Sequence, residues 1–453
     1  MAKSRNSVDM TQGSIERLLI MFALPLLLGQ IFQQLYNAVD GVVVGRFVGK
    51  EALAAVGASG NIINALISFF TGLGTGSGVV ISQYFGAHND QGVRDTVHTT
   101  VVATLILAVV CTILGVTATG TILKWMDTPA DVEPQAAAYL RIYFAGVAGL
   151  MFYNIGSGIL RAVGDSTRPL YFLIFSALLN LGLDLLFVCV FRMGIEGAAW
   201  ATILAQAISA VLTFVVLGRE QGSYRVELRA LSIKKNVLGQ VIRIGLPMAV
   251  QTGVISLSNV FVQAYINAFK SACMAGWASY NKLDAFVWLP MLSLGMAVTT
   301  FVGQNLGAGK PERARRGVRV SVVLSLVSTT LLVIPMMVFA DSFLKIFNGE
   351  EDVLYYGRMF VVYMSPFYIP YTFTQIYSGA LRGAGNSQVP MFIMLGSFVV
   401  FRQIYLYVMA NFISNEIVPI ALSYPAGWFV CSAATLLYYS RCKFDSHRLV
   451  EDV

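Results

Sequence analysis

Long apolar segments alternate with short polar segments along almost the whole chain. Each apolar segment has about 20 residues or more, which is the length that a helix needs to cross a hydrocarbon core about 30 Å thick. Transmembrane strands are excluded, because they are about ten residues long and alternate in polarity. The pattern predicts twelve membrane-spanning helices, over residues 18–44, 52–82, 96–117, 134–160, 169–191, 195–217, 241–266, 273–306, 317–339, 354–381, 389–411 and 416–439.

The composition agrees with a chain that lies in a lipid bilayer. Of its 453 residues, 56% are hydrophobic and only 12% are charged, whereas a soluble protein carries about twice that charged fraction. The fold class is therefore predicted to be an all-α polytopic membrane protein. The five cysteines and three histidines show no metal or disulfide spacing, so we expect no metal centre and no cofactor. No GxxxxGK[ST] motif occurs, which argues against an ATP-driven pump, and no nucleophile–base arrangement suggests an enzyme.

One segment of the chain returns at about half its length. LRAVGDSTRP at 160–169 is answered by LRGAGNSQVP at 381–390, and Leu24-Pro25 is answered by Leu246-Pro247. This duplication predicts two pseudo-symmetric six-helix bundles in a parallel repeat, a design found in secondary transporters. We expect the bundles over 1–217 and 241–453, with 218–240 as a cytoplasmic linker. A duplicated bundle suits alternating access, although duplication can also build a static scaffold.

The distribution of charge predicts the orientation. Most Lys and Arg residues, such as Arg225 and Lys234, lie in loops on the same side of the membrane as the N-terminus. Two loops on the other side are acidic, with Asp131 in one and Glu350 in the other. The positive-inside rule then places both termini in the cytoplasm. The basic residues are spread over many short loops, so no nucleic-acid partner is expected.

Ionisable groups at membrane depth are costly and usually functional, and the first half has two, Asp40 and Asp184. Asn180 shares a helix face with Asp184, and Asp40, Asp184 and Thr202 lie about 6 to 10 Å from the outer ends of their spans. Oxygens of this kind suit a monovalent cation, and two close carboxylates would also raise the proton affinity of one of them. Either Na⁺ or H⁺ could therefore bind. The alternative is that Asp40 meets headgroups beside Arg46 and Asp184 makes a packing hydrogen bond.

The second half carries different charges. Val262 and Gln263 stand about where Asp40 would be, while Lys282, Asp284 and Arg402 lie near mid-membrane. We expect Asp284 to pair with Arg402, because an unpaired buried charge is costly. The alternative is that Asp284 serves a cationic ligand.

Several motifs together resemble one family. They are ALPLLLGQIFQQLYNAVDGVVVGRFVG with EALAAVGAS at 23–59, SQYFGA at 82–87, LRAVGDSTRP at 160–169, NLGLDLLFV at 180–188, GIEGAAWAT at 194–202 and LRGAGNSQVP at 381–390. With these motifs the chain resembles the MATE (multidrug and toxic compound extrusion) transporters over about residues 15–440. The spans 241–266 and 354–381 contain no Asp or Glu, so the chain looks closer to the DinF-like and MepA-like side of the family.

The resemblance implies a secondary active multidrug efflux antiporter, which exports amphipathic or cationic organic compounds in exchange for Na⁺ or H⁺. Family members with a cation site in the first half place it at positions that match Asp40, Asn180, Asp184 and Thr202. We expect the drug-like substrate to lie between the two halves. The residues expected to contact it are Gln34, Asn37, Asn154 and Asp284. We also expect a monomer in the inner (plasma) membrane of a bacterium.

Two other functions are weighed against this one. A flippase for lipid-linked precursors would share the architecture but would need several Arg or Lys residues at depth, where only Lys282 and Arg402 are available. A non-transporting scaffold or sensor would show no ligand-dependent cation flux in vesicles.

Overall fold

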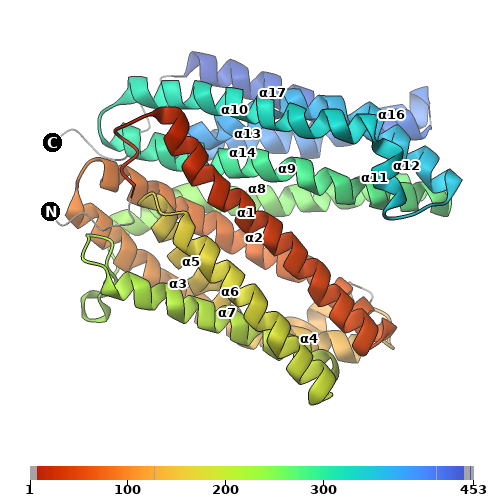
Figure 1. The fold of residues 1–453 in the computed structure, drawn as a ribbon, viewed down its shortest axis with the longest axis horizontal. Helices are drawn as coiled ribbons and strands as arrows, with labels where there is room; N and C mark the ends of the chain where they lie inside the picture. The colour runs from red at the N-terminus through yellow and green to blue at the C-terminus, as the bar shows by residue number, and fades with distance from the viewer. Residues whose placement is uncertain (1–7, 127, 415, 443–448, 450–453) are drawn as a thin grey trace. The chain divides into compact units, whose positions relative to one another are not determined.

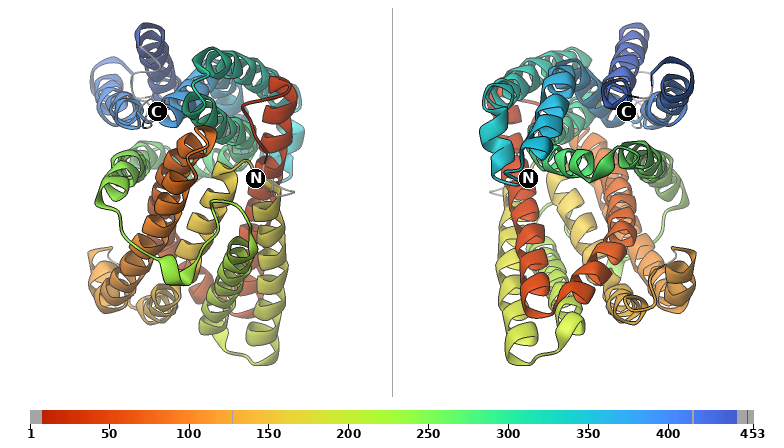
Figure 2. Two further views of the ribbon diagram at one scale, coloured as in Figure 1. Left: turned by 90° about the vertical axis from the view of Figure 1, so that its left-hand side faces the viewer. Right: turned by 90° about the vertical axis from the view of Figure 1, so that its right-hand side faces the viewer.

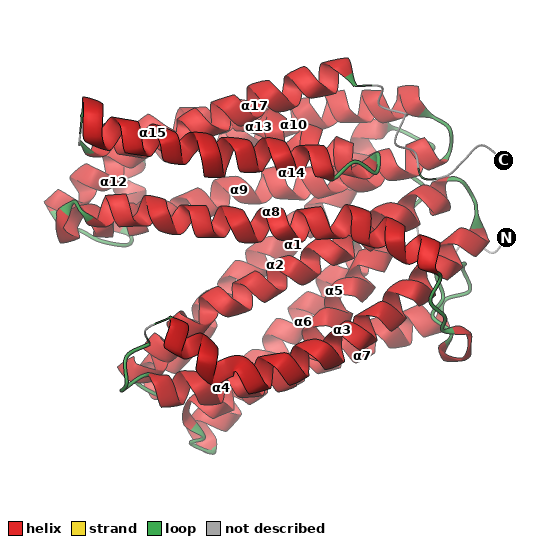
Figure 3. Ribbon diagram, turned by 180° about the vertical axis from the view of Figure 1, so that it is seen from behind, coloured by secondary structure: helices red, strands yellow, loops and turns green. Residues whose placement is uncertain are grey.

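The computed structural model describes residues 8–126, 128–414, 416–442 and 449. These residues form helices joined by short loops, and Figure 3 shows no strand among them. The predicted all-α fold class is therefore confirmed.

Most of the helices are labelled in Figure 1, and α15 is labelled in Figure 3. The α-helices are α1 Ile15–Phe47, α2 Lys50–Gly86, α3 Asp90–Trp125, α4 Glu133–Ala145, α5 Val147–Ala162, α6 Thr167–Asp184, α7 Gly194–Arg219, α8 Lys235–Asn267, α9 Lys270–Gly307, α10 Pro311–Val338, α11 Ala340–Lys345, α12 Glu351–Met364, α13 Tyr368–Gly383, α14 Gln388–Leu395, α15 Arg402–Val408, α16 Ile417–Ala421 and α17 Ser423–Arg441. The described residues also form three π-helical segments, η1 Leu185–Val190, η4 Gly396–Phe401 and η5 Met409–Ile413. They form two 3₁₀-helical segments as well, η2 Leu228–Ala230 and η3 Ser365–Phe367.

The described residues contain ten helices long and apolar enough to cross a membrane, or eleven when the bent pair α4 and α5 counts as one span. The chain is thus a multi-pass membrane protein. Two of the twelve predicted spans are not among these ten helices. The span 134–160 bends by 48° at Gly146, and the span 354–381 is divided by η3.

The residues at these two breaks explain them. A Cβ at Gly146 would stand 2.4 Å from Cβ of Ile203, so only glycine lets the junction approach α7 this closely. Pro366 lies inside η3 and has no N–H to donate, which removes a helical hydrogen bond and favours a break.

The chain divides into two compact units that cross the predicted halves. Unit 1 contains Leu28–Ala249 together with the described residues up to Asp9. Unit 2 contains Met10–Leu27 together with the described residues from Val250 onward. The first part of α1 therefore belongs to unit 2, and the first part of α8 belongs to unit 1.

Unit 1 is held together by close helix packing. Figure 2 shows α6 and α7 side by side, and α2 crosses the first part of α8 at small residues. A Cβ at Gly76 would stand 2.6 Å from Cα of Gly245, and a Cβ at Gly72 would stand 2.8 Å from the backbone N of Ala249. Small residues four apart on both helices thus let two backbones touch, as in a small-xxx-small contact.

Unit 2 has two apolar clusters. One gathers large aromatic side chains, including Trp277, Tyr368 and Trp428. The other joins Leu19 and Phe22 of α1 to residues of α9, α10 and α13. The start of α1 is therefore part of the core of unit 2.

Hydrogen bonds also fix the segment that leads into α1. Gln304 accepts from the backbone N–H of Met10 at 2.9 Å, and Asn305 donates to the Met10 carbonyl at 3.2 Å. Arg313 donates to the carbonyl of Gly13 at 2.8 Å. Side chains from the end of α9 and from α10 thus hold this backbone where no regular structure satisfies it.

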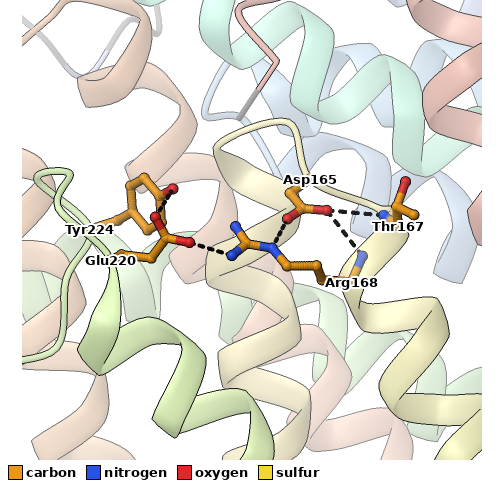
Figure 4. Close-up of polar contacts among 5 residues, drawn as sticks. All are labelled: Asp165, Thr167, Arg168, Glu220 and Tyr224. Atoms are coloured by element: carbon orange, nitrogen blue, oxygen red, sulfur yellow. Dashed lines mark hydrogen bonds and ion pairs between the residues drawn. The ribbon is translucent and has the colours of Figure 1, made fainter. Parts of the chain in front are cut away.

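The first copy of the repeated turn carries a network of buried charges (Figure 4). Arg168 forms ion pairs with both Asp165 and Glu220, and Tyr224 donates to Glu220 at 3.0 Å. Asp165 also accepts from the backbone N–H of Thr167 at 3.1 Å. The network joins the α5–α6 turn to the end of α7, and so positions the helix that carries Asp184.

We expect Arg168→Ala to destabilise unit 1 by about 3–5 kcal/mol, because it leaves two largely buried carboxylates without a counter-charge. Arg94→Ala is the matched control, since Arg94 pairs with Glu227 on the surface of the same unit and such pairs contribute about 0–1 kcal/mol. Unfolding of the detergent-purified variants measures both. Equal stability of the two variants would contradict the expectation.

Candidate cation-binding site

Two carboxyl groups from different helices meet inside unit 1. Asp40 lies on α1, and Asp184 is the last residue of α6, where only 1% of it is exposed. The two carboxyl groups lie within hydrogen-bonding reach of each other. The π-helical segment η1 begins directly after Asp184, and such segments are frequent at functional sites.

Asn180 and Thr202 complete the group, and both are buried. In the amide orientation that satisfies both ends, Asn180 donates to Asp184 Oδ2 at 2.8 Å and accepts from the backbone N–H of Thr202 at 3.1 Å. The hydroxyl of Thr202 donates to the carbonyl of Ala198 at 3.0 Å. The structure thus brings together all four residues predicted for the cation site. Their role in cation binding stays a prediction.

The site has unused acceptors. Asp40 Oδ1 and Asp184 Oδ1 are both buried and have no hydrogen-bond partner among the described residues. Two adjacent carboxylates cannot both stay ionised at low cost unless a proton or a cation lies between them. The described residues include no cluster of three or more His, Cys, Asp or Glu side chains that could hold a metal ion. This donor set, with two acids and neutral oxygens, suits one positive charge.

Aromatic residues around the site were not among the predicted ones. Tyr36 lies one helical turn before Asp40 on α1, near Thr202. Tyr143 on α4 is 2% exposed and lies near Tyr36. The spacing of four between Tyr36 and Asp40 was the signal in the sequence that could have found the first of them.

Three of the residues predicted to contact substrate lie in unit 1. Gln34 and Asn37 are exposed on α1, and Asn37 accepts from Gln33 at 3.3 Å. Asn154 on α5 is partly buried, donates to the carbonyl of Leu150 at 2.9 Å and accepts from Thr71 at 3.5 Å. Gln34 and Asn37 thus lie at the surface of α1, whereas Asn154 is engaged in packing. Their contact with a substrate stays a prediction.

The fourth predicted substrate residue, Asp284, lies in unit 2 on α9. It accepts from Trp288 Nε1 at 2.8 Å and from the hydroxyl of Tyr368, which also contacts Tyr280 at 2.5 Å. The expected ion pair between Asp284 and Arg402 is absent from the described residues. The prediction was wrong because each charge has neutral partners of its own.

The duplication predicted from the sequence is also found in comparisons with known proteins. The MatE family model matches the chain twice, over residues 25–186 and 247–408. The segments start 222 residues apart and end 222 residues apart.

Curated relatives match almost the whole chain. A probable multidrug resistance protein, YoeA of Bacillus subtilis, is 30% identical and covers 95% of this chain and 94% of its own length. A second from the same organism, YpnP, is 28% identical over 97% of this chain and 98% of its own length. The solved structure of an outward-facing MATE multidrug resistance transporter matches in fold, with a TM-score of 0.90 at 23% identity, covering 97% of this chain and 98% of that chain. This chain belongs to the MatE family, the MATE multidrug transporters.

Proposed function

We propose that the protein is a cation-coupled antiporter, which exports amphipathic or cationic organic compounds in exchange for Na⁺ or H⁺ by alternating access. The observation that carries this proposal is the pair of adjacent carboxyl groups, Asp40 and Asp184, each with a buried oxygen that has no hydrogen-bond partner. Asn180 and Thr202 supply the neutral oxygens beside them. The multidrug resistance names of the relatives support the export of organic compounds.

The coupling follows from the charge of this pair. When the site is empty, two ionised carboxylates on α1 and α6 repel each other, and a bound cation or proton removes that repulsion. Occupancy therefore favours the arrangement in which these helices stay together. A ligand shifts such an equilibrium only by the difference in its affinity for the two states. Cation binding and substrate binding favour opposite states in an antiporter.

Helix α1 is suited to carry this change. Asp40 lies in its unit 1 part, while Met10–Leu27 belongs to unit 2. A movement of α1 at Asp40 is thus passed along one continuous helix to residues that pack in the other unit. Substrate contacts at Gln34, Asn37, Asn154 and Asp284 belong to the same proposal. We also propose that the protein is a monomer and that it lies in a bacterial inner membrane with both termini in the cytoplasm.

The test is the export of a cationic dye, rhodamine 123, from proteoliposomes in which the Na⁺ gradient and the pH gradient are imposed separately. We expect at least one gradient to drive export, and the active gradient identifies the coupling ion. An ionophore that dissipates that gradient should stop export. If neither gradient drives export by folded protein, the proposed function is wrong.

A further inference from the structure

Unit 2 has lost the acidic side chains at the positions that match the cation site of unit 1. The spacing of 222 between the two matched segments pairs Asp40 with Val262 and Asp184 with Leu406. Val262 and Leu406 are both fully buried in the aromatic-rich apolar cluster of unit 2. The duplicated position in unit 2 therefore cannot hold a cation through carboxylates.

Counted from the ends of the matched segments, the spacing of 222 pairs Asn180 of unit 1 with Arg402 of unit 2, one residue more than the 221 that separate the repeated turns at 160–169 and 381–390. Arg402 begins α15 directly after the π-helical segment η4, whereas Asp184 directly precedes the π-helical segment η1. Its Nη2 donates to Ser258 Oγ at 2.7 Å and to Asn259 Oδ1 at 2.8 Å. By the same spacing Ser258 and Asn259 match Tyr36 and Asn37 beside Asp40. Unit 2 thus keeps the position and the neighbouring helices but carries a guanidinium there.

The positive charge of Arg402 has no anionic partner among the described residues. Only 2% of the residue is exposed, and no ion pair of the described chain includes it. Its two acceptors are neutral, and Nε is buried without any hydrogen-bond partner. A buried arginine is normally paired with an anion, because a lone charge in a low dielectric is costly. An unused N–H on a buried cation points to a ligand that supplies negative charge.

The guanidinium lies directly beneath side chains that reach the surface of the unit. The ring of Tyr424 covers its face, with 4.8 Å between the guanidinium carbon and the ring centroid. Tyr424 is partly exposed, and Asn259 is exposed. The ring of Tyr424 also contacts Trp277 and Trp428 of the buried cluster, with ring centroids 5.5 Å and 6.1 Å apart. A small group would therefore reach Arg402 by displacing the exposed side chain of Asn259.

We infer that Arg402, Asn259 and Tyr424 form an anion-binding site in unit 2, which is the charge-inverted counterpart of the cation site in unit 1. The ligand is a small anionic group. It is either a free anion such as chloride or the carboxylate of an aromatic transported compound whose ring stacks on Tyr424. Arginine suits both, because its planar N–H groups bind carboxylates in pairs and its face stacks on aromatic rings.

The free-anion source is tested by thermal unfolding of the purified full chain in potassium chloride, bromide and nitrate, with potassium gluconate as the bulky reference anion. We expect the small anions to raise the unfolding temperature of the wild type and of Arg402→Lys, and Arg402→Gln to lose that rise. Arg382→Gln is the matched control, because Arg382 is also an arginine of unit 2 with a buried, unpartnered Nε, but it lies at the repeated turn and is partly exposed.

The carboxylate source is tested with two dyes that share one ring system. Rhodamine 110 has a free carboxylate, and rhodamine 123 is its methyl ester. We expect Arg402→Gln to weaken binding of rhodamine 110 to the purified protein by about tenfold or more, as for the loss of a charge-assisted hydrogen bond, and to change binding of rhodamine 123 by less than about twofold. A misfolded variant would lose both dyes equally, so their ratio separates charge from fold.

The outcomes are distinct. A rise with small anions that needs Arg402 supports the free-anion source, and selective loss of rhodamine 110 supports the carboxylate source. If Arg402→Gln keeps the anion response and binds both dyes as the wild type does, or loses both dyes equally, the inference is overturned. It is also overturned if Arg382→Gln alone removes the response. These are binding measurements, so they stand whether or not the vesicle assay finds cation-driven export.

Discussion

Asp40→Asn and Asp184→Asn are each expected to abolish cation-driven export, with at least a hundredfold fall in rate, while the protein stays folded. Asparagine has nearly the shape of aspartate but cannot be ionised, so the site loses the charge that binds a cation. The substitution also removes repulsion between two buried carboxylates, and the free energy of unfolding should therefore stay the same or rise. Rhodamine 123 export in proteoliposomes and thermal unfolding measure the two effects.

The same variants should lose their stabilisation by the coupling ion. A ligand that binds only the folded state at a hundred times its dissociation constant stabilises by about 2.7 kcal/mol. We expect that increment in the wild type and its loss in both variants. Asp341→Asn is the control, because Asp341 forms an exposed ion pair with Arg358. Full export by Asp40→Asn and Asp184→Asn would refute the assignment of the site.

The second large effect is expected at the crossing of α2 and α8 in unit 1. Gly76→Ala and Gly245→Ala each place a Cβ within 3 Å of the facing backbone, which cannot move aside as a flexible side chain would. Overpacking of this kind costs about 1–3 kcal/mol. It also opposes the gain of up to about 1 kcal/mol that alanine usually brings to a helix.

Matched controls lie on the same two helices. Gly60 on α2 and Gly239 on α8 have no atom within 4 Å of a Cβ built on them. Alanine at either position should leave the unfolding temperature unchanged or raise it. Thermal unfolding in detergent should therefore show lower stability for Gly76→Ala and Gly245→Ala. The controls Gly60→Ala and Gly239→Ala should show no such loss. If all four variants behave alike, the backbone contact does not constrain the unit.

The positions of the helices could be predicted because continuous apolar length is a property of the sequence itself. The breaks could not be predicted, since they depend on what lies opposite. The span bends at Gly146, where Ile203 of α7 comes close to the backbone. The sequence around Gly146 does not show which residue will lie opposite it. The close contacts of Gly72 and Gly76 could not be predicted either, because their partners, Ala249 and Gly245, are about 170 residues away in the sequence.

The candidate site shows the same division. Depth along each helix and the family resemblance both selected Asp40, Asn180, Asp184 and Thr202, and the structure places these side chains together. Tyr36 escaped prediction because its role depends on the side of α1 that faces Thr202.

The prediction of an ion pair between Asp284 and Arg402 failed for a related reason. The cost of burying charge shows that each residue needs partners, but it does not say which. Trp288 and Tyr368 satisfy the carboxylate, while Ser258 and Asn259 accept from the guanidinium. Only the rotation of each helix about its axis decides between these partners, and the sequence does not contain it.

The start of α1 belongs to unit 2 and the start of α8 belongs to unit 1, which has a consequence for synthesis on the ribosome. The surface of α2 at Gly72 and Gly76 packs against residues 245–249, which are translated long after the rest of unit 1. Met10–Leu27, in turn, is made first but finds its core only after α9, α10 and α13 have been inserted. Unit 1 therefore cannot complete its packing until the start of the second half has been translated, and Met10–Leu27 cannot pack until most of unit 2 has been inserted. A gene cut at the linker would give two fragments, each of which carries the segment that completes the other.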